Sequence, residues 1–212
     1  MRELVHALRE RSHDPRRRAD AVLDPAQALP PPVSAEQLAR AGVLLGFALP
    51  ALLRSLYLEV GNGGFGPGYG LARLPQEPTA DDLVGLYWHL CADPRQPDPN
   101  RFFDSLRVQA LPAAEDEPEC DDEPGEFLWD WPRELVPIFM HGCGAYECIR
   151  WTEADGPVIL HDPDVLGPGM KMADSLTATA PTLEERLGAW LAGDDVYERA
   201  KQRLSRLARD KD

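Results

Sequence analysis

The sequence predicts an α+β fold, in which an antiparallel meander sheet packs against helices. Three strand-like runs follow one another at 135–140, 145–151 and 157–161, separated only by short breaks that contain glycine. Such breaks join antiparallel neighbours, so the runs should form a meander. Segments with apolar residues three or four positions apart, which are typical of amphipathic helices, precede and follow the three runs.

We divide the chain into three parts. Residues 1–33 are expected to form an N-terminal helical arm and a proline-rich linker, residues 34–193 the α+β domain, and residues 194–212 a C-terminal helix. The arm begins with a helix over residues 1–12, and three prolines at 30–32 form a stiff connector. The helix has an apolar stripe of Leu4, Val5 and Leu8. The pattern leaves open whether the arm docks on the domain.

The α+β domain opens with a capped helix. Ser34 has the side chain of an N-cap, and Gln37 three residues later completes the capping-box pattern. Gly46 is expected to end the helix, because glycine adopts the left-handed conformation readily. The inward face consists of Leu38, Ala41 and Leu45.

The stretch from Leu49 to Gly70 joins a second helix to a glycine-rich turn. Pro50 suits the first turn of this helix, where its missing N–H would be unpaired in any case. Gly61 or Asn62 is expected to close the helix in a left-handed conformation, and a strand should follow. The apolar face of the helix consists of Leu52, Leu53, Leu56 and Tyr57. The turn contains Gly63, Gly64, Gly66, Gly68 and Gly70, and the strand carries Tyr69, Leu71 and Leu74.

Three more helices are predicted, at 81–90, between 182 and 193, and at 195–209. Their expected N-caps are Thr79, Thr182 and Asp194. Between the first and second strand-like runs the chain must reverse direction, and glycine-containing breaks are suited to tight hairpins. The residues of this break are His141, Gly142, Cys143 and Gly144.

The formal net charge of the chain is −14, and an acidic insertion at about 113–126 contributes much of it. Residues 115–126 contain eight acidic residues and no basic one. Such a run repels itself and buries little apolar surface, so we expect a solvated loop. It is either an insertion without function or an electrostatic recognition surface. Nucleic-acid backbones require a basic face, so we expect no nucleic-acid partner.

Location and redox state follow from what the sequence lacks. No run of eighteen apolar residues is present, so we expect no membrane span. The first 18 residues have neither the apolar core nor the cleavage site of a secretory signal, which indicates a cytoplasmic protein. The cysteines should therefore be reduced thiols. They are Cys91, Cys120, Cys143 and Cys148.

The chain resembles the SUKH superfamily, which joins fungal cell-wall-synthesis regulators with bacterial toxin-immunity proteins. The resemblance covers about residues 35–193 and rests on the helix at 36–46, on LPALLRSLYLEVGNGG at 49–64, and on LVPIFMHGCGAYECIRW at 135–151. It implies an α+β fold with a concave surface for a protein partner, and neither a cofactor nor an enzymatic activity. The bound toxin differs between subfamilies, so the partner's identity does not follow.

Two patterns could suggest chemistry. Residues 61–66 match G-x-G-x-x-G, but dinucleotide binding requires the motif to follow a strand and to open a helix. Here a predicted helix precedes it and Pro67 follows, so a structural corner is favoured.

The best metal-ligand candidates are His141, Cys143, Cys148 and His161. Their spacing lacks the C-x-x-C of zinc sites, which favours thiols and a turn histidine without metal. A Cys143–His141 nucleophile pair lacks an orienting third group.

These observations predict a non-enzymatic, protein-binding domain. The leading hypothesis is an immunity protein that occludes the cleft of a toxin, and the alternative is a regulatory interaction module. A basic toxin domain, such as a nuclease, would be attracted by the negative charge. The candidate partner-binding residues are Asp116, Asp121, Asp122, Glu123, Trp129 and Trp131. For the two tryptophans, packing in the core at the entrance of a strand is the alternative.

Overall fold

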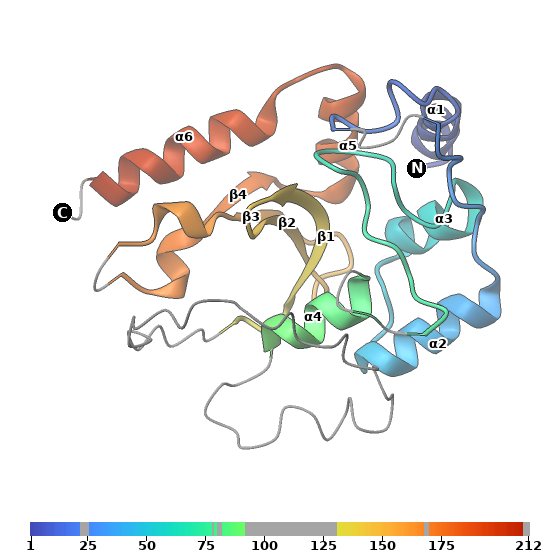
Figure 1. Cartoon of the computed structure of the whole chain (residues 1–212), viewed down its shortest axis with the longest axis horizontal. Helices are drawn as coiled ribbons and strands as arrows, with labels where there is room; N and C mark the ends of the chain where they lie inside the picture. The colour runs from blue at the N-terminus through green and yellow to red at the C-terminus, as the bar shows by residue number, and fades with distance from the viewer. Residues whose placement is uncertain (22–25, 78, 80–81, 92–130, 168–169, 210–212) are drawn as a thin grey trace, which may run out of the picture.

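The computed structural model describes residues 1–21, 26–77, 79, 82–91, 131–167 and 170–209. In chain order the elements are α1 (Arg2–Ser12), α2 (Ala35–Leu45), α3 (Ala51–Glu59), α4 (Leu83–Cys91), β1 (Leu135–Gly142), β2 (Ala145–Arg150), β3 (Val158–His161), the 3₁₀ turns η2 (Pro163–Val165) and η3 (Met172–Ser175), β4 (Leu176–Ala180), α5 (Leu183–Leu191) and α6 (Val196–Arg209). Figure 1 shows the sheet at the centre, with α1, α2 and α3 to one side of it. The predicted α+β fold is confirmed.

The sheet is an antiparallel meander with the strand order β1-β2-β3-β4. The three predicted strands are present, whereas β4 was missed. Its sequence, LTATA, consists mainly of small and β-branched residues, and only Ala180 among them is buried. The apolar alternation that indicates a half-buried strand is therefore weak in β4.

A two-residue turn joins β1 to β2 inside the break predicted at 141–144, because His141 and Gly142 belong to β1. Gly142 pairs with Ala145, and the two residues between them, Cys143 and Gly144, both have positive φ, 49° and 76°. Positive φ at both central residues is the requirement of a type I′ hairpin turn, which fits the twist of the flanking strands. The turn therefore closes the hairpin tightly, and the register of the two strands shifts at two places further along, between Pro137 and Phe139 and between Met140 and Gly142.

The helix caps follow the sequence with two corrections. Ser34 and Gln37 form the predicted capping box of α2. The N-cap role at α4 belongs to Asp82 and not to Thr79, because the Asp82 carboxylate accepts hydrogen bonds from the N–H groups of the first turn. At α6 the capping carboxylate is Asp195, which accepts from Glu198 N at 3.1 Å. A carboxylate one residue from the predicted position satisfies the same unpaired N–H groups.

The main hydrophobic core lies between the helices and one face of the sheet. It joins α1, through Val5 and Leu8, with buried residues of α2, α3, α4, β1, β2 and α5. Arg11 further ties α1 to α5, since its guanidinium lies 3.8 Å from the Trp190 ring and donates to the Trp190 carbonyl. The N-terminal arm therefore docks on the domain, which the sequence left open.

The opposite face of the sheet carries a smaller cluster, formed by Trp131, Leu135, Cys148 and Met172. A third cluster attaches α6 to the sheet and consists of Leu160, Ala200 and Leu204. Figure 1 shows α6 running along the β3 and β4 side of the molecule. Within the described residues, no helix combines the length and the apolar character needed to span a bilayer.

The glycine-rich turn differs from its prediction in two respects. Neither Gly61 nor Asn62 is left-handed; positive φ begins at Gly63. The Asn62 side chain instead exchanges hydrogen bonds with the backbone of Leu74, at 2.7 and 2.9 Å. The predicted strand after the turn is reduced to a single antiparallel bridge, Leu71 to Phe139. The segment lies beside β1 without extending the sheet.

Candidate functional site

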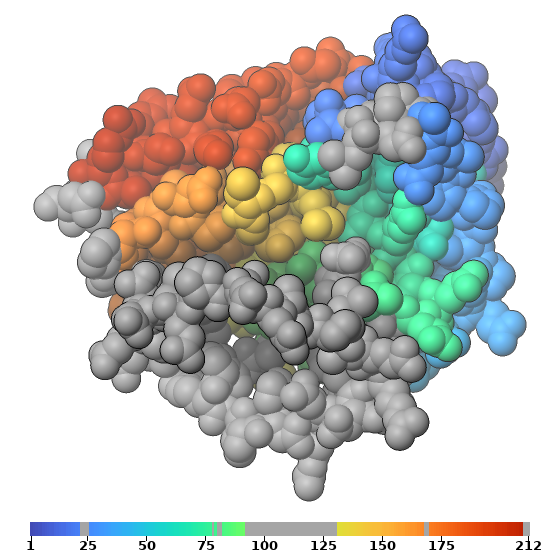
Figure 2. All heavy atoms as spheres, viewed as in Figure 1, coloured from blue at the N-terminus to red at the C-terminus, as the bar shows by residue number. Residues whose placement is uncertain are grey.

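Three chain segments meet at the glycine-rich corner, residues 66–73. Residues 18–21 run beside it, with Gly66 N donating to Arg18 O at 2.7 Å. On its other side the corner follows β1, with Tyr69 N donating to Met140 O at 2.8 Å. In Figure 2 the corner (teal) reaches the surface between the N-terminal segment (blue) and the strands (yellow). Segments from three parts of the chain thus form one surface.

Tyr69 is the exposed aromatic residue of this surface. Its side chain lies over the β1–β2 hairpin, so close that a Cβ on Gly142 would be 3.2 Å from the Tyr69 ring. The residue is 39% exposed and lines one pocket, and its chain neighbour Gly68 lines a second one. We call Tyr69 and these two pockets the corner surface.

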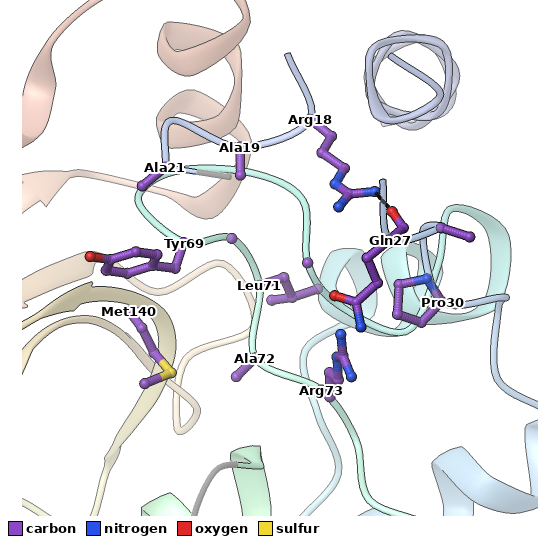
Figure 3. Close-up of a pocket in the computed structure, with 13 residues that line it drawn as sticks. Arg18, Ala19, Ala21, Gln27, Pro30, Tyr69, Leu71, Ala72, Arg73 and Met140 are labelled. Carbon is purple, nitrogen blue, oxygen red and sulfur yellow. Dashed lines mark hydrogen bonds between the residues drawn. The ribbon is translucent and has the colours of Figure 1, made fainter. Parts of the chain in front are cut away.

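The first pocket, here the cationic pocket, has a volume of about 280 Å³. Arg18 and Arg73 line it together with Gln27, while Leu71 and Met140 provide apolar surface, as Figure 3 shows. None of the described residues that line this pocket is acidic. The charged side chains among the described lining residues are therefore all cationic, although the chain as a whole has a net charge of −14.

The second pocket, here the acidic pocket, has a volume of about 360 Å³ and lies on the other side of Gly68. Asp20 is part of its wall and joins two elements, because its carboxylate accepts from Trp190 Nε1 at 2.7 Å and from Gly68 N at 2.9 Å. Four carboxylates line the pocket, and they belong to Asp20, Asp194, Asp195 and Glu198. Two of its lining residues, Arg11 and Arg186, are cationic.

A buried ion cluster contributes two lining residues, Arg186 and His141, to the acidic pocket. Glu147 on β2 is 0% exposed and receives two hydrogen bonds from Arg186 on α5, at 2.6 and 2.9 Å. His141 on β1 completes the cluster, with its Nε2 3.1 Å from the Glu147 carboxylate. The His141 ring stacks on Tyr197 of α6 at 3.9 Å. Four elements are thus held together under the pocket.

The protonation state of the cluster follows from its contacts. Burial by itself raises the pKa of Glu147, but the hydrogen bonds from His141 and Arg186 and the positive charge of Arg186 outweigh it. The pKa of Glu147 therefore lies below its ordinary value, and the carboxylate is ionised at neutral pH. An ionised pair of this kind orients side chains firmly, because breaking it leaves a charge unpaired in the interior.

Sequence reasoning missed the Glu147–Arg186 pair. The two residues are separated by 39 positions, so no local pattern joins them. Each of the two residues, however, stands out in the sequence as a charged residue among apolar positions. Glu147 shares a strand face with Ile149, and Arg186 falls between the apolar positions Leu183 and Leu187. A charged residue on an apolar face requires a partner, and two such residues of opposite sign are a natural pair.

Of the predicted partner-binding residues, the structure describes Trp131. Trp131 is 4% exposed, packs in the smaller cluster, and donates its indole N–H to Leu135 O at 2.9 Å. It is a core residue, as the alternative interpretation proposed, and it is not part of the corner surface. The other predicted residues lie outside the described part of the chain, namely Asp116, Asp121, Asp122, Glu123 and Trp129.

The four metal-ligand candidates each have another environment. The Cys148 thiol is buried, which raises its pKa well above the ordinary value, and Cys143 is exposed at the hairpin. His161 Nδ1 lies 2.8 Å from the Ser175 hydroxyl, and His141 contacts Glu147. Among the described residues, no group of three or more His, Cys, Asp or Glu side chains is placed to hold a metal ion.

The G-x-G-x-x-G segment is a packing corner. It follows α3 and leads into an extended segment, which is the reverse of the strand-to-helix context that dinucleotide binding requires. Gly63 shows why glycine is needed here, because a Cβ on it would lie 2.5 Å from Leu71 O. The glycines thus let two stretches of backbone touch, as the sequence analysis predicts.

Comparison with protein families gives a match over most of the chain. The model of the SMI1 / KNR4 family (SUKH-1) matches residues 32–188. This range includes the corner and the Glu147–Arg186 pair, but neither Arg18 nor α6. No curated protein and no solved structure matches the chain.

Proposed function

The chain belongs to the SMI1 / KNR4 family (SUKH-1), and from this membership we propose that it binds a protein partner through the corner surface. The family is one of non-catalytic immunity and regulatory domains. We further propose that the partner is a toxin and that binding occludes its active cleft in the cytoplasm.

The observation that carries the proposal is the composition of the corner surface. An exposed tyrosine is a common centre of binding energy at protein interfaces, because it buries a large rigid ring and retains a polar hydroxyl. Here Tyr69 lines the cationic pocket, and the adjacent Gly68 lines the acidic pocket. Complementary charges on a partner would fix its orientation and exclude other proteins.

Long-range attraction to a basic toxin would come from another part of the chain. Residues 92–130 contain 12 acidic and 3 basic residues, whereas the described residues contain 20 acidic and 18 basic ones. We therefore propose that the acidic run, with Asp116, Asp121, Asp122 and Glu123, accelerates association with a basic partner, and that Trp129 contributes a contact.

A regulatory role is the second candidate, since the family also contains regulatory domains. Such a domain would use the corner surface to recruit a partner without neutralising it. The two roles differ in what happens to the partner's activity.

The test is co-purification with the product of the neighbouring gene, followed by growth rescue. An immunity protein should form a stable complex and restore growth of cells that express the toxin, and Tyr69→Ala should reduce both effects. A complex without rescue favours the regulatory role. Rescue that is unaffected by Tyr69→Ala, with the complex intact, contradicts the corner surface as the binding site.

A further inference from the structure

We propose that the cationic pocket binds a carboxylate group, supplied by an aspartate or glutamate side chain of the protein partner. The partner rests on the proposed function, whereas the carboxylate site itself stands on the geometry of the pocket. A basic toxin would thus contact this acidic protein partly through one of its own acidic residues.

The charge of the pocket is the first argument. Arg18 and Arg73 stand on its walls, and the described lining residues include no carboxylate. Acidic side chains are not scarce elsewhere, since the described residues contain 20 of them and the neighbouring pocket has four. A pocket that is lined by arginine side chains in a chain rich in acidic residues favours an anionic ligand group.

The donors of the pocket are side chains. The backbone N–H groups of Gly64 and Leu71 are already engaged, at 2.8 and 2.7 Å, by the carbonyls of Leu71 and Phe65. The exposed guanidinium of Arg73, by contrast, makes no hydrogen bond or ion pair with any described residue, and the same is true of the Gln27 carboxamide. Figure 3 shows the Gln27 carboxamide and the Arg73 guanidinium pointing toward one another.

This pair of groups offers the hydrogen-bond donors that a carboxylate requires. The guanidinium fork of arginine donates two parallel hydrogen bonds to the two oxygens of one carboxylate, and the amide of Gln27 offers a further N–H. Arg18 is only 7% exposed, and its Nη1 donates to Gln27 O at 2.6 Å. That bond holds a positive charge behind the site, in surroundings where water screens it less.

The size of the pocket suits a side chain. Its volume of about 280 Å³ lies near the lower end of the range of about 300–1,000 Å³ that is typical of ligand pockets. Leu71, Ala72 and Met140 provide an apolar lining. The methylene groups of a glutamate would pack on this lining while its carboxylate reaches Arg73.

The test is an NMR titration of the ¹⁵N-labelled full chain with N-acetylglutamate N-methylamide. We expect saturable shifts of the Gln27 side-chain signal and of the backbone signals of residues 69–73. The matched neutral probe, N-acetylglutamine N-methylamide, should bind at least about tenfold more weakly, because a guanidinium forms stronger hydrogen bonds with a carboxylate than with a neutral amide. Inorganic phosphate forms a third arm that identifies a general anion site.

Variants locate the binding. Arg73→Gln should weaken the glutamate probe about tenfold, and Arg73→Lys, which keeps the charge but loses the fork, should give an intermediate loss. The control is Arg54→Gln, at an exposed arginine of α3, and it should leave binding unchanged. Equal binding of both amino-acid probes, binding of phosphate alone, or an unchanged affinity of Arg73→Gln would overturn the proposal.

The outcome is separable from that of the proposed function. If the partner co-purifies equally well with the wild type and Arg73→Gln, the carboxylate contact is wrong and the protein-binding function stands. If no partner is captured but the glutamate probe binds at Arg73, the pocket stands and the proposed function fails.

Discussion

The two pockets of the corner surface differ in the charge of their lining residues and in the contacts that hold their walls in place. Part of the wall of the cationic pocket is the glycine corner, where a Cβ added to Gly70 would lie 2.6 Å from Phe65 N. The acidic pocket rests on a buried ion cluster that draws side chains from four elements. One pocket therefore depends on local backbone conformation and the other on long-range side-chain pairing.

This difference shows how a strongly acidic chain presents a mixed surface. The net charge of −14 describes neither pocket, because much of it comes from residues 92–130. A partner that fills both pockets must present an anionic and a cationic group at a fixed separation. Such an arrangement selects one orientation, which net charge alone does not do.

The largest predicted effect breaks the support of the acidic pocket. Glu147→Ala leaves Arg186, which is 2% exposed, as an unpaired buried cation, so the free energy of unfolding should fall by about 3–5 kcal/mol. Urea denaturation measures this loss. The control is Glu153→Ala, which removes an exposed pair with Arg150 and should cost under about 1 kcal/mol.

The double variant Glu147→Leu with Arg186→Met sharpens this test. It removes both charges and should recover most of the lost stability, because no charge is left unpaired. Equal losses in the single and double variants would contradict the role assigned to the buried pair.

The free energy of unfolding should decrease in acid, mainly because His161 is buried in the folded protein. Burial lowers the pKa of His161 to about 4 in the folded protein, from about 6.5 when unfolded. The unfolded state therefore binds the proton first, and stability should fall as the pH drops from 6.5 to 4, by about 3 kcal/mol in total. Glu147, whose pKa is lowered, loses its contribution only at lower pH. Urea unfolding at pH 7, 5.5 and 4 measures the loss, and His161→Gln should flatten it; an unchanged slope would contradict the assignment.

A substitution in the glycine corner beside the cationic pocket should lower the free energy of unfolding by a smaller amount. Gly70→Ala places a Cβ 2.6 Å from Phe65 N at a φ of +91°, which should destabilise the fold by about 2–3 kcal/mol. Gly188→Ala is the matched control, since nothing lies within 4 Å of a Cβ there and the residue is in α5. It should stabilise the protein by about 0.5–1 kcal/mol. Thermal unfolding distinguishes the two, and a tolerated Gly70→Ala would refute the packing argument.

Salt should slow the association of the protein with a basic partner. For a basic partner, the association rate constant should fall tenfold or more between low salt and about 0.5 M salt, because screening removes long-range attraction. Stopped-flow mixing measures the rate. Neutralising Asp121, Asp122 and Glu123 should weaken the dependence, and a rate independent of salt would rule out electrostatic steering.

The sequence predicts those parts of the molecule whose causes are local. The cap of α2 needs only Ser34 and Gln37, and the β1–β2 turn needs only residues 141–144. The strand predicted after the glycine turn failed for the opposite reason. Its neighbours are residues 18–21 and β1, and only the folded chain brings them together.

The candidate site was less accessible to sequence reasoning than the fold. Tyr69 was interpreted as a strand residue, and its exposure depends on how the corner packs on Gly142. Arg18 lines a pocket with Arg73, which is 55 positions away, so no local pattern joins the two residues. Charged residues on an apolar face, such as Glu147, are the signal that sequence analysis could have followed.

The most direct test of the account compares two exposed apolar side chains in binding to the co-purified partner. Tyr69→Ala should weaken the complex by about thirtyfold or more, which corresponds to about 2 kcal/mol, the loss typical of an interface hot spot. Val43→Ala removes the side chain of a residue that is 81% exposed on α2, away from the corner, and should change affinity less than twofold. Isothermal titration calorimetry gives both dissociation constants. A complex that tolerates Tyr69→Ala, or that Val43→Ala weakens more, would contradict binding through the corner surface.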